Sequence, residues 1–151
     1  MKPYTVSIEI DLPRDRVIEL FDNPDNLFKW QTGLQSFEHL SGQSGQPGAR
    51  SKLVYQAGKR TIELFETVTE RKLPDEFNGI YEWNGGKNTL QNRFIELGPN
   101  RTKWESTCEY HFTSILLKLM GFLAPGMFRK QNLGFLESFK AFCEHGRDVR
   151  G

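Results

Sequence analysis

Hydrophobic and polar residues alternate at the start of the chain, over residues 5–10. A period of two is typical of a strand with one buried face. Pro13 then occupies a favourable first-turn position, and the apolar residues after it recur at helical spacing until Asn23-Pro24 ends the pattern. A second short helix is expected to end near Trp30. The beginning of the chain therefore predicts one strand followed by two short helices.

Short extended runs separated by turn residues follow from Leu34 onward. Connections of this length predict an antiparallel meander of five or six strands. Phe37 and Phe65 lie on the opposite parity to their apolar neighbours, and one bulge would exchange the faces of a strand. The predicted turns fall at residues 41–48, 57–58, 73–75, 84–86 and 98–100.

The end of the chain returns to helical spacing. Pro125-Gly126 is expected to kink or split this helix, because proline lacks the backbone donor and crowds the preceding turn. We interpret residues 116–123 as a stripe that faces the sheet; an exposed patch for a partner protein or a membrane surface is the alternative. The apolar helical positions are Leu116, Leu119, Met120 and Leu123, and then Phe128, Gln131, Phe135 and Phe139.

The composition is that of one soluble globular domain. The chain has 151 residues, of which 37% are hydrophobic and 26% charged, and its formal net charge is +1. The near balance of charge disfavours a nucleic-acid partner. Residues 115–127 form the most apolar segment, but a lysine, two glycines and a proline interrupt it. Stable membrane insertion is therefore not expected.

The cysteines and the first residues bear on location and cofactors. The N-terminus lacks the continuous apolar stretch of a signal peptide. Cys108 and Cys143 lie far apart and form no CxxC pair, so they are interpreted as reduced thiols. The histidines, cysteines and carboxylates show no spacing typical of a metal site, and no metal or other cofactor is expected. These features favour a cytoplasmic location.

The order of elements predicts an α+β fold, in which the terminal helix is the only element long enough to cover one apolar face of the sheet. Four segments carry a resemblance to a known family: residues 8–13 (IEIDLP), residues 23–27 (NPDNL) before Trp30, residues 47–49 (PGA), and residues 135–140 (FLESFK). The chain resembles the START-like, Bet v 1-like (SRPBCC) superfamily, and within it the polyketide cyclase/dehydrase branch.

This resemblance implies a helix-grip fold: a seven-stranded antiparallel sheet curled around a long C-terminal helix, with two short helices after the first strand and a cavity between sheet and helix. Residues 1–146 would form a single helix-grip ligand-binding domain, and residues 147–151 a C-terminal tail. Members of the superfamily bind sterols, lipids, polyketides and other apolar molecules. Some of them catalyse cyclisation or dehydration in the cavity.

The residues themselves also favour a cavity, because one helix cannot fill the concave side of a strongly curved sheet. Aromatic residues make up 13% of the chain, and their flat side chains leave gaps as readily as they fill space. The alternative is that the same inward positions form a solid core. The candidate lining residues are Tyr55, Leu64, Glu66, Tyr81, Trp83, Asn92, Cys108 and Tyr110 from strands, with Met120, Met127 and Gln131 from the helix.

Glu66 is the best candidate for a general acid or base, because it shares parity with apolar residues and a carboxylate facing an apolar space is costly. Two other interpretations remain: a bulge could turn Glu66 to solvent, or it could pair with Lys52 or Arg93. His39 and His111 are weak candidates, since the first lies near a loop and the second falls on the solvent face.

The leading functional hypothesis is binding of a small, largely apolar molecule, by a carrier or sequestering protein. The first alternative is a cyclase/dehydrase-type enzyme, in which Glu66, Tyr81 or Tyr110 would move a proton on a ligand in the same cavity. The second is a protein-interaction module similar to a co-chaperone. A monomer or a homodimer is compatible with each hypothesis.

Overall fold

The computed structural model describes residues 1–151 and contains one seven-stranded antiparallel sheet with the strand order β1-β7-β6-β5-β4-β3-β2. Sequential strands from β2 to β7 are neighbours, as the predicted meander requires, and β1 closes the sheet by pairing with β7. The strands are β1 Tyr4–Ile10, β2 Leu34–Ser41, β3 Arg50–Ala57, β4 Arg60–Lys72, β5 Glu76–Trp83, β6 Gly86–Gly98 and β7 Arg101–Phe112.

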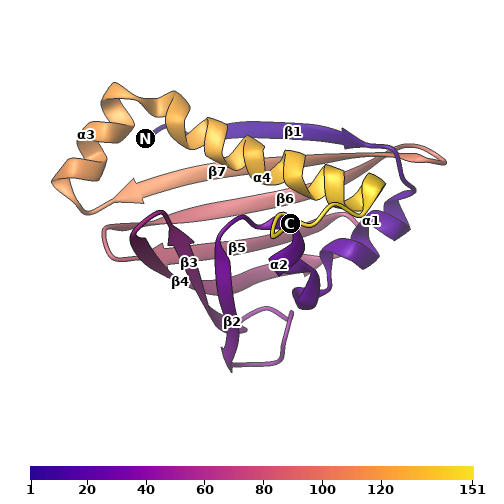
Figure 1. Cartoon of the computed structure of the whole chain (residues 1–151), viewed down its shortest axis with the longest axis horizontal. Helices are drawn as coiled ribbons and strands as arrows, with labels where there is room; N and C mark the ends of the chain where they lie inside the picture. Colours follow the sequence, from indigo (N-terminus) through magenta and orange to yellow (C-terminus); the bar gives the residue numbers. More distant parts are fainter.

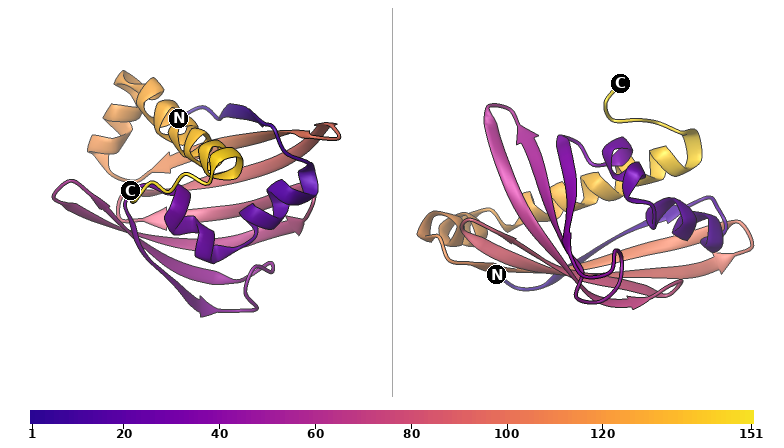
Figure 2. Two further views of the ribbon diagram at one scale, coloured as in Figure 1. Left: turned by 45° about the vertical axis from the view of Figure 1, so that its right-hand side comes forward. Right: turned by 90° about the horizontal axis from the view of Figure 1, so that it is seen from below.

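Four α-helices and one 3-10 turn accompany the sheet, and the longest helix lies on its concave face (Figure 1). Figure 2 shows the sheet bending so that β2, β3 and β4 rise beside this helix, while α1 and α2 cover one end. The predicted curled sheet around a long C-terminal helix is confirmed. The helical elements are α1 Arg14–Phe21, the 3-10 turn η1 Pro24–Asn26, α2 Leu27–Trp30, α3 Ile115–Leu123 and α4 Pro125–His145.

Two of the sheet's register shifts bear on which side chains face the concave side. β2 shifts register between Leu34 and Ser36, so Leu34 and Phe37 both point inward although three positions separate them. β4 shifts between Val68 and Glu70. Phe65 comes before that shift, so its side chain stays on the outer face of the sheet, away from the cavity. Of the two aromatic residues with an ambiguous parity, a bulge therefore turns only Phe37 toward the interior.

The core at the α1–α2 end of the molecule is aromatic and solid. Phe139 of α4 is fully buried, and its ring centroid lies 5.0 Å from that of Trp30 and 5.1 Å from that of Trp104. Phe21 of α1 packs edge-on against Phe139 with centroids 6.1 Å apart. At the other end of α4, Phe128 contacts a smaller buried group on β7. Side chains therefore fill both ends of the space between sheet and helix.

The C-terminal helix is split, as the Pro125-Gly126 signal predicts. Ala124 has φ −137° and ψ 60°, which ends α3, and Pro125 takes the first position of α4. Gly146 caps α4 with a positive φ of 64°, and the tail returns so that Val149 N–H donates to the carbonyl of Lys29 at 2.9 Å. No helix of the chain is both long enough and apolar enough to cross a membrane.

The predicted sheet-facing stripe on residues 116–123 is wrong. Leu116, Leu119 and Leu123 are 65%, 51% and 68% exposed. The physical reason is that α3 extends past the sheet and packs only through its other face, where a Cβ at Gly121 would lie 2.9 Å from the Phe112 ring. The helix therefore turns most of its leucines toward solvent.

Candidate functional site

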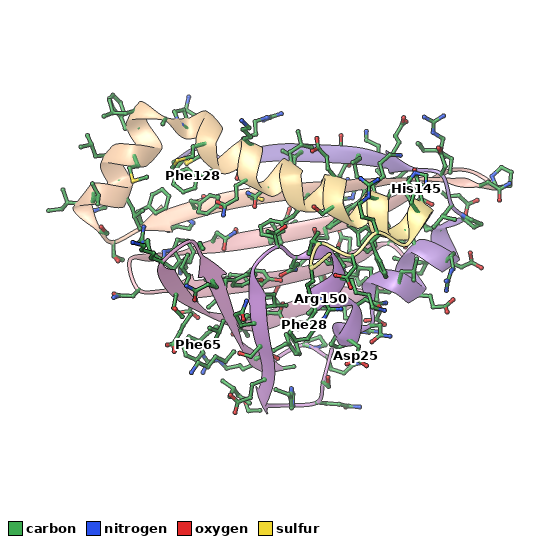
Figure 3. The ribbon with its side chains drawn as sticks, viewed as in Figure 1. Asp25, Phe28, Phe65, Phe128, His145 and Arg150 are labelled. Carbon is green, nitrogen blue, oxygen red and sulfur yellow. The ribbon has the colours of Figure 1, made fainter.

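A cavity of about 520 Å³ lies between the concave face of the sheet and α4. Its volume is typical of small-molecule sites, which span about 300–1,000 Å³. Twenty of its 36 lining residues are hydrophobic, so most of a bound molecule would meet apolar surface. Phe128 marks one end of α4 above this space and His145 the opposite, solvent-exposed end (Figure 3).

A row of polar side chains crosses the floor of the cavity. The strand register places Ser51 opposite Glu66, Glu66 opposite Tyr81, Tyr81 opposite Asn88 and Asn88 opposite Tyr110. All five line the cavity, because residues that are paired across an antiparallel sheet share a face. Ser51 and Asn88 are buried, and no side-chain hydrogen bond within the chain involves them. Their polar groups are therefore free to meet a ligand.

Glu66 occupies the middle of this row and has one hydrogen-bond partner. The Tyr81 hydroxyl donates to Glu66 Oε2 at 2.7 Å. Neither basic residue that the sequence offered as a partner reaches Glu66, because Lys52 and Arg93 lie against other glutamates, at 3.3 Å and 3.9 Å. The bulge in β4 comes after Glu66 and does not turn it outward. The carboxyl group thus faces the cavity without a neutralising cation.

The protonation of this pair follows from burial. Desolvation raises the pKa of Glu66, and the hydrogen bond from Tyr81 opposes part of that rise. Burial, together with the neighbouring Glu66 charge, raises the pKa of Tyr81 well above 10.0. Tyr81 therefore stays protonated and remains the donor. Glu66 therefore holds its proton at higher pH than an exposed glutamate, and its carboxyl group can act as either a proton donor or a proton acceptor.

A second polar cluster forms where α4 crosses the edge of the sheet. The Asn132 carboxamide lies 3.1 Å from the Tyr110 hydroxyl and 3.4 Å from Cys108 Sγ, and it also donates to the Tyr4 hydroxyl. Burial raises the pKa of Cys108 to about 11, so its thiol is protonated. The cluster fixes Tyr110 at one end of the polar row.

The cavity is closed near α1 by an ion pair. Arg71 Nη1 lies 2.8 Å from Asp22 Oδ1 and also donates to the carbonyl of Gly45 at 3.2 Å. Gly45 belongs to the β2–β3 loop, where Ser44, Gly45 and Gln46 all contribute to the cavity wall. Arg71 thereby ties the loop to the end of α1.

Solved structures with similar backbones include a START superfamily protein from Mycobacterium smegmatis (12% identity, TM-score 0.71, 98% of this chain and 97% of the other covered). A conserved protein from Geobacillus kaustophilus (16%, 0.78, 97% and 97%) and the Zhui aromatase/cyclase from Streptomyces sp. R1128 (10%, 0.76, 95% and 93%) have the same arrangement. The chain has the helix-grip fold of the START-like, Bet v 1-like superfamily. No protein-family model matches the sequence, and no curated protein matches it.

The helix-grip cavity includes eight of the eleven residues that the sequence placed on its wall. Whether they bind a ligand stays a prediction. The eight are Tyr55, Leu64, Glu66, Tyr81, Trp83, Asn92, Tyr110 and Gln131.

Cys108, Met120 and Met127 do not line the helix-grip cavity, contrary to the expectation. Cys108 is fully buried, with its sulfur 3.4 Å from the Asn132 carboxamide, and it has no surface on the cavity. Met120 belongs to α3, which does not lie over the sheet, and Met127 is 43% exposed on the first turn of α4. The split at Ala124 was expected, but its effect on the two methionines was not: it gives α3 and α4 different faces, and neither helix turns its methionine toward the cavity.

Several wall residues of the helix-grip cavity were missed by the sequence interpretation. Ser51 and Asn88 share parity with predicted strand positions, but only the register shows that they flank the Glu66–Tyr81 pair. Trp30 was expected only as the end of a helix. It lines the cavity, and its buried Nε1 has no hydrogen-bond acceptor within the chain. No local signal distinguishes these three positions from ordinary core residues.

The mouth of the helix-grip cavity lies between α4 and the end of β3. A more open groove runs outside α4, and five residues border both spaces. Tyr55 stands just inside, with its hydroxyl donating to the Gln31 side chain. The shared residues are Thr32, Gln56, Ala57, Gln131 and Phe135.

Replacing Glu66 by Gln should stabilise the helix-grip fold at pH 8 and leave its stability unchanged near pH 4. Because folding raises the pKa of Glu66 above its usual 4.5, the native state binds the proton more tightly, and stability is lost as pH rises from that value through the folded-state pKa. The gain is about 1.4 kcal/mol for each unit of pKa that folding adds.

Urea unfolding at both pH values measures this difference. Glu63→Gln is the matched control, because Glu63 neighbours the site in sequence but is 57% exposed and pairs with Lys52. It should change stability by less than about 0.5 kcal/mol. Equal effects of the two substitutions at pH 8 would contradict the buried, proton-binding role of Glu66.

Proposed function

We propose that this chain binds a small, largely apolar molecule in its helix-grip cavity and acts as a carrier or sequestering protein. The observation that carries the proposal is the 520 Å³ cavity with its mainly hydrophobic wall. Removing apolar surface from water would drive binding, at about 25 cal/mol per Å². A cytoplasmic location fits the two free thiols, Cys108 and Cys143.

The polar groups of the cavity narrow the ligand class. Ser51 and Asn88 offer a hydroxyl and a carboxamide on either side of the Glu66–Tyr81 pair, and the Trp30 indole offers a donor at the solid end. Buried polar groups without partners are costly, so a ligand that pairs with them is favoured over a pure hydrocarbon. A lipid, polyketide or aromatic metabolite with hydroxyl or carbonyl groups along an apolar body fits this pattern.

An enzyme of the cyclase/dehydrase type is the second candidate, and the isolated Glu66 carboxyl favours it. A carboxyl group with a raised pKa and no cation beside it can accept a proton from a bound ligand and return it to another atom. Tyr81 would stabilise the carboxylate through the 2.7 Å hydrogen bond while that proton is away. The similarity to an aromatase/cyclase is one of fold and assigns no reaction to this chain.

Native mass spectrometry of protein purified without organic solvent tests the binding proposal. We expect a co-purifying apolar mass, together with saturable binding of a fluorescent fatty-acid or sterol probe. The expected stoichiometry is one molecule per chain, since the binding proposal rests on a single cavity between the sheet and α4. A clean apo mass combined with no binding of either probe would refute both the carrier and the enzyme.

Glu66→Gln separates the carrier from the enzyme once a ligand has been identified. An enzyme that uses Glu66 as acid or base should lose turnover by about 10²–10⁴-fold while ligand affinity is largely kept. A carrier should show only a modest change in affinity and no chemical conversion of the ligand by either protein. Chromatography of the ligand after incubation with each protein provides the measurement.

A further inference from the structure

The most exposed apolar surface of the molecule lies on α3 and the start of α4, away from the cavity wall. Phe122 is 82% exposed and Ile115 is 84% exposed, values far outside what packing against the sheet would give. Six of the nine large hydrophobic residues that the protein exposes belong to this region. We define the α3 patch as Ile115, Leu116, Leu119, Phe122, Leu123 and Met127.

The charged residues that lie near the α3 patch in the sequence are basic. No Asp or Glu occurs between Glu109 and Glu137, whereas Lys118, Arg129 and Lys130 all fall in this interval and are exposed. None of these three forms an ion pair; Arg129 lies over the ring of Tyr4, with its guanidinium carbon 5.9 Å from the centroid. Glu109 already lies 3.5 Å from His111.

The N-terminus adds to this basic surrounding. Gly121 of α3 lies close enough to Met1 that a Cβ on it would be 3.6 Å from the Met1 sulfur. The Met1 amino group and Lys2 are therefore near the same end of the molecule. Figure 1 shows the N-terminus beside α3 and α4, whereas α1 and the β6–β7 turn lie at the opposite end.

We propose that the α3 patch docks the protein onto an anionic lipid bilayer surface. Leucine and phenylalanine side chains on a short helix can enter the headgroup region, while flanking Lys and Arg bind anionic lipids. A second copy of the chain fits less well, because a symmetric contact would bring the same basic groups of two patches together. The apolar side chains of the patch therefore match the acyl region of a bilayer, and the basic side chains match its anionic headgroups.

The α3 patch lies next to one end of the cavity, so docking would affect how that end is placed. α4 continues directly from the patch, and its residues Phe128, Gln131 and Asn132 line the cavity. A docked molecule would hold this end of the cavity next to the bilayer. The docking itself does not depend on the cavity being occupied, so it can be tested separately from the proposed function.

Co-sedimentation with vesicles tests the docking. The full chain should sediment with phosphatidylcholine vesicles containing about 30% phosphatidylserine and remain in solution with phosphatidylcholine alone, and about 0.5 M salt should release it. Phe122→Ser/Leu123→Ser should weaken binding about tenfold. The control Leu40→Ser/Leu97→Ser removes two leucines that are 43% and 45% exposed on β2 and β6, outside the α3 patch, and should bind as the unmodified protein does.

The basic groups are tested in the same assay. Lys118→Gln/Arg129→Gln/Lys130→Gln should weaken binding to the anionic vesicles at least about tenfold, whereas Arg16→Gln/Arg101→Gln, at the opposite end of the molecule, should not. Circular dichroism confirms that each variant is folded. The proposal is overturned if the full chain does not sediment with anionic vesicles. It is also overturned if each patch variant and its control lose binding equally. It is also overturned if ultracentrifugation reveals a stable dimer that Phe122→Ser/Leu123→Ser dissociates.

Discussion

Phe139→Ala should lower the free energy of unfolding by about 3–5 kcal/mol, the range for removing a fully buried phenylalanine. Phe139 is 0% exposed and lies between the rings of Trp30 and Trp104, with centroids 5.0 and 5.1 Å from its own. Phe21 closes the cluster from α1. Loss of the ring would leave a cavity that these large, mutually packed side chains cannot close, because each is held by the others.

Equilibrium unfolding in guanidinium chloride measures the effect. Phe122→Ala is the matched control, since Phe122 is 82% exposed on α3 and its ring supports no core contact. That substitution should change stability by less than about 0.5 kcal/mol. If the two substitutions cost the same, the aromatic cluster is not what joins α4 to the sheet.

Ser51→Trp should lower affinity for the apolar probe by at least about 100-fold while the fold is retained. Ser51 is small and points into the cavity beside Glu66, so an indole at this position would occupy space that the ligand needs. The protein should tolerate the ring, because open volume rather than packed side chains faces position 51. Probe titration and thermal unfolding give the two readouts.

Ser36→Trp provides the comparison for this blocking variant. Ser36 lies on the adjacent strand β2 and is exposed, so a tryptophan there should leave both affinity and thermal stability nearly unchanged. Full probe affinity in folded Ser51→Trp would show that the probe binds elsewhere. The open groove outside α4 would then be the next site to test.

Much of the candidate site was predictable because the side-chain period of a strand is two. Glu66, Tyr81 and Tyr110 share parity with apolar neighbours, and the structure places all three on the cavity wall. The hairpin turns also follow from local chemistry, as at Gly85, which has a positive φ of 125°. Such features depend on residues close together in the chain.

Other features required contacts between distant segments. Leu116 and Leu123 have helical spacing that suits a buried stripe, yet both are exposed, because α3 extends beyond the sheet that would have covered them. Periodicity predicts that a helix has an apolar face, but it does not predict which element packs against that face. The three residues wrongly assigned to the cavity wall reflect the same limitation, as each depends on where a helix ends or what covers it.

The sequence by itself determined the α+β order of elements, the alternation of faces along each unbulged strand and the split at Pro125, since backbone sterics and side-chain periodicity act over a few residues. Tertiary structure decided that Ser51, Glu66, Tyr81 and Asn88 form one row, because register joins four strands. It also decided that this row faces a hollow rather than a packed interior. Whether side chains fill the space between a curved sheet and a helix depends on the distance between them, which no single segment encodes.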